Sequence, residues 1–238
     1  MPRQIARELT PALGNSRSIL RCATAGGSLR RMTLRLLLGI ALCIFAGCHS
    51  GKKSAGVPKE YEPRAGDFVF QSLPHNPLID AIEGSSGSPF SHCGIVKRRG
   101  EQWVVIEAIG PVKETTLSWW IAQGRDKAFV TYRLREPLTQ KIPAIIAAAE
   151  KYEGRPYDIH YDMDDEKIYC SELLYKAVRD ATGRKLGKIR KLGELNWRPY
   201  EQVIRNIENG NLPLDREMIT PRDFSEAPEL QQIFRSRM

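Results

Sequence analysis

A histidine and a glutamate have the types and the spacing to support catalysis. His92 and Glu107 lie in SPFSHCGIVKRRGEQWVVIEAI, residues 88–109, whose pattern predicts a β-hairpin. If the hairpin turns through Arg99 and Gly100, His92 and Glu107 are direct cross-strand neighbours on one face. A carboxylate at that position can orient the imidazole and support its cationic form. The alternative is a strand-end carboxylate beside a half-buried core histidine.

Cys170 is the candidate nucleophile. It precedes SELLYKAVRDATG, whose apolar spacing predicts a helix that starts at Cys170 and ends at Gly183. Free N–H groups and the helix dipole favour thiolate at a helix N-terminus, and a nearby His92 would add to this effect. We therefore expect the face that carries His92 and Glu107 to be turned toward Cys170. The alternative is a buried structural thiol.

Cys93 directly follows His92, so it should face the other side of the strand and belong to the core. If the leader described below is removed and Cys48 carries lipid, Cys93 and Cys170 are the two remaining cysteines. They either pair with each other or leave at least one thiol free for chemistry.

The surrounding pattern predicts one α+β domain. We expect two further strands, a short helix after the first strand, and two helices besides the one at Cys170, over 67–73, 128–134, 75–84, 143–154 and 200–210. The acidic segment DMDDE, at 162–166, lacks the spacing and glycine of a calcium loop, so a solvated turn is favoured over a metal site. Residues 184–200 are basic and loop-like.

Residues 1–48 have the layout of an export signal. Basic residues precede an apolar run at 36–45, which is too short to span a bilayer comfortably and leads into FAGC. FAGC resembles a bacterial lipobox, in which Cys48 becomes the lipidated first residue of the mature protein; the alternative is an ordinary cleaved signal. Translation could start at Met32. Residues 49–65 are expected to form a tether.

The formal charge of +8 is concentrated in this leader. Residues 1–48 carry +6 of it, which leaves +2 for the rest of the chain. Nucleic-acid binding therefore loses its main support, and we expect no nucleic-acid partner.

Five segments, GDFVF, SHCGIV, VVIEAI, GRPYD and YCSELLYKAV, resemble the permuted papain-like amidases, the YiiX- and YaeF-like relatives of NlpC-type cell-wall peptidases. The resemblance runs over 66–178, and the histidine precedes the cysteine as in the permuted branch. It implies a circularly permuted papain-like domain over 66–238, with an antiparallel sheet packed with helices. It also implies that Cys170 is the nucleophile, His92 the general base, Glu107 its orienting partner, and Tyr157 an aid to the oxyanion or substrate.

This resemblance implies an exported cysteine amidase or peptidase that acts on amide bonds, with cell-wall peptides, including peptidoglycan, as the expected substrates. We expect it to be lipid-anchored on the periplasmic side of the envelope, at the outer membrane, and to need no metal or organic cofactor. DMDDE and the basic stretch depart from the family pattern and leave the substrate open.

Two other classes of function stay open. One is a lipid acyltransferase or thioesterase, as in relatives of lecithin retinol acyltransferase, which an apolar groove beside Cys170 would favour. The other is a non-catalytic envelope-binding lipoprotein, which an unreactive Cys170 would favour.

Overall fold

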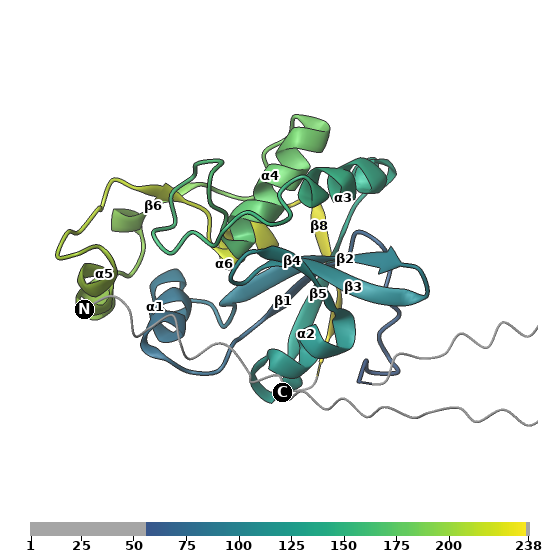
Figure 1. Ribbon diagram of the computed structural model, residues 1–238, viewed down its shortest axis with the longest axis horizontal. Helices are drawn as coiled ribbons and strands as arrows, with labels where there is room; N and C mark the ends of the chain where they lie inside the picture. Colours follow the sequence, from purple (N-terminus) through teal and green to yellow (C-terminus); the bar gives the residue numbers. More distant parts are fainter. Residues whose placement is uncertain (1–55, 237–238) are drawn as a thin grey trace, which may run out of the picture. The chain divides into compact units, whose positions relative to one another are not determined.

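A mixed arrangement of helices and antiparallel strands forms the part of the chain that the computed structural model describes, residues 56–236 (Figure 1). The predicted leader, Cys48 and the first part of the tether lie outside these residues. The main sheet has the strand order β4-β3-β2-β1-β5-β8. Its strands are β1 (Phe68–Gln71), β2 (His92–Arg99), β3 (Gln102–Ala108), β4 (Val112–Thr116), β5 (Phe129–Leu134) and β8 (Leu230–Arg235). A second, two-stranded sheet pairs β6 (Arg190–Lys191) with β7 (Glu217–Met218).

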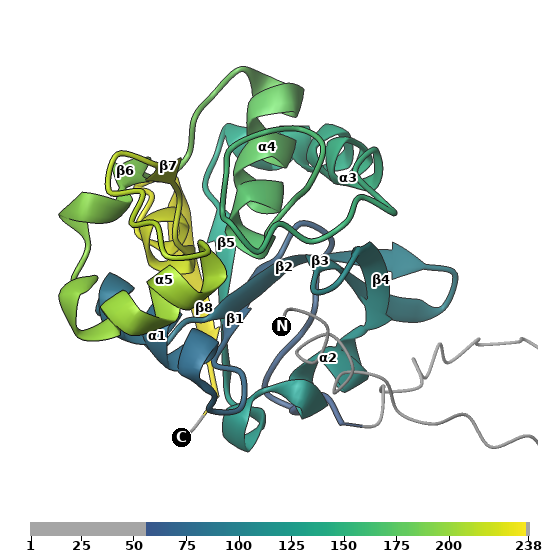
Figure 2. The same ribbon diagram turned by 60° about the vertical axis from the view of Figure 1, so that its left-hand side comes forward.

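Helices cover both faces of the main sheet. They are α1 (Pro77–Ser86), α2 (Leu117–Gln123), α3 (Ile142–Glu150), α4 (Cys170–Thr182), α5 (Glu201–Ile207) and α6 (Pro221–Ser225). In Figure 1, α3 and α4 lie together on one face and α2 on the other. Figure 2 shows α1 and α5 beside each other, close to the small sheet of β6 and β7. No helix within residues 56–236 has the length and apolarity needed to cross a bilayer.

The alternation of side chains along the strands creates two separate cores. Phe68, Phe70 and Ile95 belong to the larger core, which includes the buried face of α4. Val69 and its neighbours on the opposite side pack with Trp120 of α2 in the smaller core. The two faces therefore have different partners, and the site described below draws on both.

Local signals set the ends of several helices. α4 ends at Gly183, whose φ of 71° is the left-handed conformation that favours glycine. α1 starts where Asn76 accepts the N–H of Ile79, but it continues through Gly84, where we predicted its end. Gly84 serves a packing purpose instead, because a Cβ there would collide with the ring of Tyr200.

The hairpin of β2 and β3 has a different register from the predicted one. Arg99 pairs with Gln102, so the turn is formed by Gly100 and Glu101, and Gly94 is the residue opposite Glu107. Gly100 has a φ of 58°, which favours glycine and places it inside the turn. The prediction that His92 directly opposes Glu107 was therefore wrong by two residues. Because side chains alternate with a period of two, a shift of two keeps both on the same face.

The predicted tether also needs a correction at its end. Tyr61, which falls within 49–65, is only 4% exposed and packs in the smaller core. Its hydroxyl donates a 2.8 Å hydrogen bond to the buried carboxylate of Asp67. The packed part of the chain thus begins before Gly66.

Candidate active site

His92 and Glu107 form a fully buried pair. The Nε2 atom of His92 lies 2.5 Å from Oε2 of Glu107, and the two side chains are 2% and 0% exposed. Gly94 explains how they meet diagonally across the hairpin. A Cβ at Gly94 would lie 2.4 Å from Cγ1 of Val105 and 3.5 Å from Cβ of Glu107, so no side chain occupies the space between the partners.

Glu107 has two further hydrogen-bond donors. Thr115 of β4 donates from Oγ1 to Oε1 at 2.5 Å, and Gln123 at the end of α2 donates from Nε2 to Oε2 at 3.1 Å. Burial alone would raise the pKa of Glu107, but hydrogen bonding to His92 and Thr115 lowers it below its usual value. The carboxylate is therefore ionised at neutral pH and held from three sides.

The face that carries this pair is not the one we predicted. The ring of His92 lies 6.0 Å, centroid to centroid, from that of Trp120, and Gln123 also belongs to α2. The pair thus sits on the α2 side of the sheet, whereas Cys170 packs in the core on the α4 side. His92 is the first residue of β2, so its ring can reach Cys170 at the end of the strand.

Cys170 is the first residue of α4 and is 3% exposed. The preceding residue, Tyr169, has extended backbone geometry, and its N–H donates to Oε2 of Glu172 at 3.2 Å. This contact closes the start of the helix from one side. The thiol is therefore presented at a defined helix N-terminus, as the sequence predicts.

Cys170 and His92 shift each other's charge state. Hydrogen bonding from the Cys93 thiol is the largest cause that holds the pKa of Cys170 well below its usual value, and hydrogen bonding from His92 adds to it against the effect of burial. Burial alone would lower the pKa of His92, but hydrogen bonding to Cys170 and Glu107 outweighs it and raises the pKa to about 9. The arrangement favours a thiolate beside an imidazolium.

Cys93 is in the core, as predicted, but on the same side as Cys170. Both cysteines are free and buried and belong to the larger core. Burial and hydrogen bonding to Cys170 raise the pKa of the Cys93 thiol well above its usual value. The expectation that Cys93 faces away from the candidate nucleophile was wrong, because Cys170 packs on the α4 side of the sheet whereas His92 points to the α2 side.

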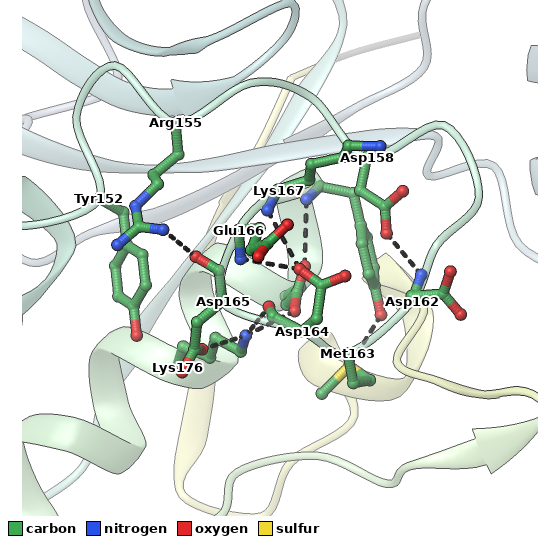
Figure 3. A network of polar contacts seen from close by, with 12 residues as sticks. Tyr152, Arg155, Asp158, Asp162, Met163, Asp164, Asp165, Glu166, Lys167 and Lys176 are labelled. Carbon is green, nitrogen blue, oxygen red and sulfur yellow. Dashed lines mark hydrogen bonds and ion pairs between the residues drawn. The ribbon is translucent and has the colours of Figure 1, made fainter.

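The acidic segment before α4 is exposed at its tip and tied to the helix (Figure 3). The buried ammonium of Lys176 lies 2.8 Å from Oε1 of Glu172 and 2.6 Å from Oδ1 of Asp165, and it donates to the carbonyl of Asp164. Oδ1 of Asp164 in turn accepts from two backbone N–H groups further along the loop. DMDDE therefore fastens the chain that leads into Cys170.

Tyr157 lies close to this site. Its hydroxyl is 3.3 Å from that of Tyr161, and it pairs with Ile168 in an isolated parallel bridge just before α4. Burial is the main cause that raises the pKa of Tyr157 well above its usual value, with Tyr161 and Cys170 adding to it. Tyr161 and Tyr169, rather than Tyr157, are among the residues that line the pocket beside Cys170. The role of Tyr157 stays a prediction.

A mostly apolar pocket opens beside Cys170. It has an empty volume of about 770 Å³, including the part open to solvent, and one wall of it comes from α1 and α5. These helices contribute Leu78, Ala81, Ile82, Val203, Ile204 and Ile207. His160 and Arg216 also line it, and both contact Glu208 at its edge. The sequence shows no partner for His160, because Glu208 belongs to a distant segment.

Between residues 56 and 236, no three histidine, cysteine, aspartate or glutamate side chains are grouped so that they could hold an ion.

Comparison with known proteins places this arrangement in a family. Residues 62–234 match the family described as permuted papain-like amidase enzymes, YaeF/YiiX, C92 family. The uncharacterized protein YiiX of Escherichia coli K12 is 30% identical over 176 residues, which cover 73% of this chain and 87% of YiiX. A crystal structure described as the metalloprotein yiiX from Escherichia coli O157:H7 has a TM-score of 0.71 and 30% identity, and the match covers 75% of this chain and all of that one. The chain therefore belongs to the permuted papain-like amidase family of YaeF and YiiX.

Proposed function

We propose that this protein is a cysteine hydrolase that cleaves an amide bond through Cys170, His92 and Glu107. Its family is one of amidases and peptidases, which gives the general class of reaction. The observation that carries the proposal is the buried contact between His92 and Glu107 beside a cysteine at a helix N-terminus. A purely structural histidine does not need an ionised, triply hydrogen-bonded carboxylate behind it.

In the first half-reaction, the Cys170 thiolate attacks the carbonyl carbon of the substrate. His92, protonated and held by Glu107, gives its proton to the leaving amine as the carbon–nitrogen bond breaks. The product of this step is an acyl group on Cys170, and the amine leaves. The raised pKa of His92, about 9, keeps the proton available at neutral pH.

The oxyanion of the tetrahedral intermediate would be stabilised by backbone N–H groups at the start of α4. The first N–H groups of a helix have no carbonyl partner within it and point toward the N-terminus, where Cys170 lies. Tyr157 is a second candidate donor, because the charge of Cys170 is among the causes that raise the pKa of its hydroxyl.

In the second half-reaction, water takes the place of the amine. Neutral His92 accepts a proton from water as the oxygen attacks the acyl carbon, and the sulfur–carbon bond then breaks. The resulting thiolate and imidazolium restore the starting state. Glu107 remains ionised throughout and holds the ring in place.

The cellular location of the protein is part of the proposal. The basic segment, the short apolar run and FAGC support export and lipidation at Cys48, and so an envelope location with the domain on a tether. On this basis we propose peptides of the cell wall, including peptidoglycan, as substrates. Labelled palmitate should enter the wild type and not Cys48→Ser; equal labelling of the two would contradict the anchor.

A second candidate function has a specific observation in its favour. The pocket beside Cys170 is lined mainly by aliphatic side chains, which suits an acyl chain better than a polar peptide. The thioester of an acyl-enzyme would be the same in a lipid acyltransferase or thioesterase, with the acyl chain in the pocket. The two candidates thus share the Cys170 chemistry and differ in what the pocket holds.

The metal implied by the name of the relative from Escherichia coli O157:H7 does not fit this chain as described. Within residues 56–236, no three histidine, cysteine, aspartate or glutamate side chains are grouped so that they could hold an ion. The proposed steps therefore use side chains and backbone groups of this chain.

The deciding experiment is to incubate the full chain with peptidoglycan fragments and, separately, with acyl lipids, and to identify products by mass. Amide hydrolysis of a wall peptide, absent in Cys170→Ser, would support the first candidate, and release or transfer of an acyl chain the second. Ile204→Asn should lower turnover of acyl-lipid substrates more than turnover of wall peptides, because Ile204 lines the apolar pocket. Asn206→Ala, at an exposed residue of the same helix, is the matched control. Turnover that survives Cys170→Ser would contradict both.

A further inference from the structure

Two free thiols share the same small region of the core. Cys93 is the second residue of β2, and Cys170 starts the helix that packs against this strand. Both belong to the larger core, and both are free. The β2–β3 ladder begins only at Gly94, so Cys93 lies at the open end of β2, the strand against which α4 packs.

The two thiols differ in access. Cys170 is among the residues that line the open pocket, whereas Cys93 is 0% exposed and is not among them. A small reagent that enters the pocket therefore meets Cys170 first and finds Cys93 behind it. The opposite pKa shifts of the two thiols act in the same direction, since the pKa of Cys170 is lowered and that of Cys93 is raised.

We propose that Cys170 and Cys93 form a reversible redox site, in which a peroxide oxidises Cys170 and Cys93 resolves the product to an intramolecular disulfide. The established membership of an amidase family does not include such a role. The inference requires a reactive Cys170 but no amide hydrolysis, so it can fail while the proposed function stands, and the reverse also holds.

The chemistry balances with hydrogen peroxide as the oxidant. The Cys170 thiolate attacks one peroxide oxygen, the oxygen–oxygen bond breaks, and the sulfur becomes a sulfenic acid while hydroxide takes up a proton and leaves as water. The Cys93 sulfur then attacks the Cys170 sulfur, and the sulfur–oxygen bond breaks. The departing hydroxyl leaves as water with the Cys93 proton. Two thiols are oxidised and one peroxide is reduced to two waters.

A resolving cysteine in this place has a definite consequence. A sulfenic acid without a neighbouring thiol can be oxidised further to sulfinic acid, which thiol reductants do not reverse. The disulfide instead blocks the nucleophile temporarily and returns it intact after reduction. Cys93 would therefore protect Cys170 from irreversible loss while the oxidant is present.

The test is peptide mapping of the full chain after brief treatment with hydrogen peroxide, followed by unfolding in denaturant and alkylation of the remaining thiols. Trypsin should release Cys93 in the peptide 65–97 and Cys170 in the peptide 168–176. In the wild type, we expect these two peptides to be joined, alkylation of both cysteines to fall about tenfold, and a dithiol to reverse both changes. This readout does not depend on any substrate.

Two variants make the roles distinct. In Cys93→Ser, or Cys93→Ala if the serine variant does not fold, Cys170 should proceed to sulfinic acid that a dithiol cannot reduce. In Cys170→Ser, Cys93 should stay reduced under the same treatment, because it is shielded and protonated. Sulfinic acid at Cys170 of the wild type with Cys93 still reduced, no oxidation of either, or a disulfide to a cysteine outside this pair would overturn the proposal.

Discussion

The two faces of the main sheet supply different parts of the candidate site. The α4 face is a large apolar core in which Cys170 is held by the start of a long helix and by buried neighbours. The α2 face has a smaller core, and on it Glu107 accepts hydrogen bonds from Thr115 and Gln123 and holds His92 in turn. The candidate nucleophile thus depends on packing, and the candidate base depends on a polar network. Substitutions that disturb packing on the α4 face should therefore lower stability, whereas substitutions in the polar network on the α2 face should lower reactivity.

Removal of the nucleophile should have the largest effect. Cys170→Ser keeps nearly the same side-chain volume, and we expect it to lower turnover about 10⁴-fold or more while leaving a cooperative unfolding transition. The measurement is product formation on whichever substrate class the mass analysis identifies, alongside circular dichroism on heating. Turnover within about tenfold of the wild type would mean that the reaction does not pass through Cys170.

A cavity on the α4 face should cost stability rather than reactivity. Leu174 is fully buried in α4, and Leu174→Ala should lower the free energy of unfolding by about 3 kcal/mol. The alkylation rate of Cys170 in the folded protein should stay close to that of the wild type. Denaturant unfolding and timed alkylation measure the two quantities; a large fall in the rate with unchanged stability would contradict the division between the faces.

Neutralising the carboxylate on the α2 face should have the opposite signature. In Glu107→Gln the imidazolium loses its anion, so we expect turnover to fall about 10²-fold. His92 has a pKa of about 9, and it must be protonated to act as the acid, so wild-type activity should fall as the pH rises through about 9. In the variant this loss should begin at lower pH, because the raised pKa depends partly on Glu107.

The control for Glu107→Gln is Glu101→Gln, which removes a fully exposed carboxylate from the turn of the same hairpin. It should leave both the rate and the pH profile unchanged. Equal pH profiles for the wild type and Glu107→Gln would show that the carboxylate does not tune His92.

Loss of one supporting donor should have the smallest effect. Gln123→Leu removes the amide that donates to Oε2 of Glu107, and we expect about a tenfold loss of turnover, equivalent to about 1.4 kcal/mol. Trp119→Ala is the matched change on the same helix, since Trp119 is 64% exposed, and it should leave turnover unaffected. Equal losses in the two variants would point to a general effect of α2 rather than to positioning of Glu107.

Local signals made part of this site predictable. The start of α4 at Cys170 and its end at Gly183 follow from periodicity and a glycine cap. The prediction that His92 and Glu107 share a face is correct although the predicted register is wrong, because the register error is an even number of residues. The left-handed conformation of Gly100 determines where the hairpin turns. The sequence shows that a glycine is present but not which position of the turn it occupies.

The remaining features depend on tertiary packing. Thr115 and Gln123 belong to β4 and α2, and nothing in their local sequence indicates that they meet Glu107. The position of Cys93 beside Cys170 was missed for a related reason. Alternation along β2 gives the face of Cys93, but only the packing of α4 shows that the nucleophile is on that face.

The most direct test of the central claim is the alkylation rate of each cysteine. Brief iodoacetamide treatment at neutral pH, followed by peptide mass analysis, should label Cys170 in the wild type much faster than Cys93, because the pKa of Cys170 is held well below its usual value and that of the buried Cys93 well above it. His92→Ala should slow labelling of Cys170 about tenfold or more by removing its cationic partner, and should leave Cys93 unlabelled. Preferential labelling of Cys93, or a Cys170 rate unchanged in His92→Ala, would contradict the account of a thiolate paired with His92.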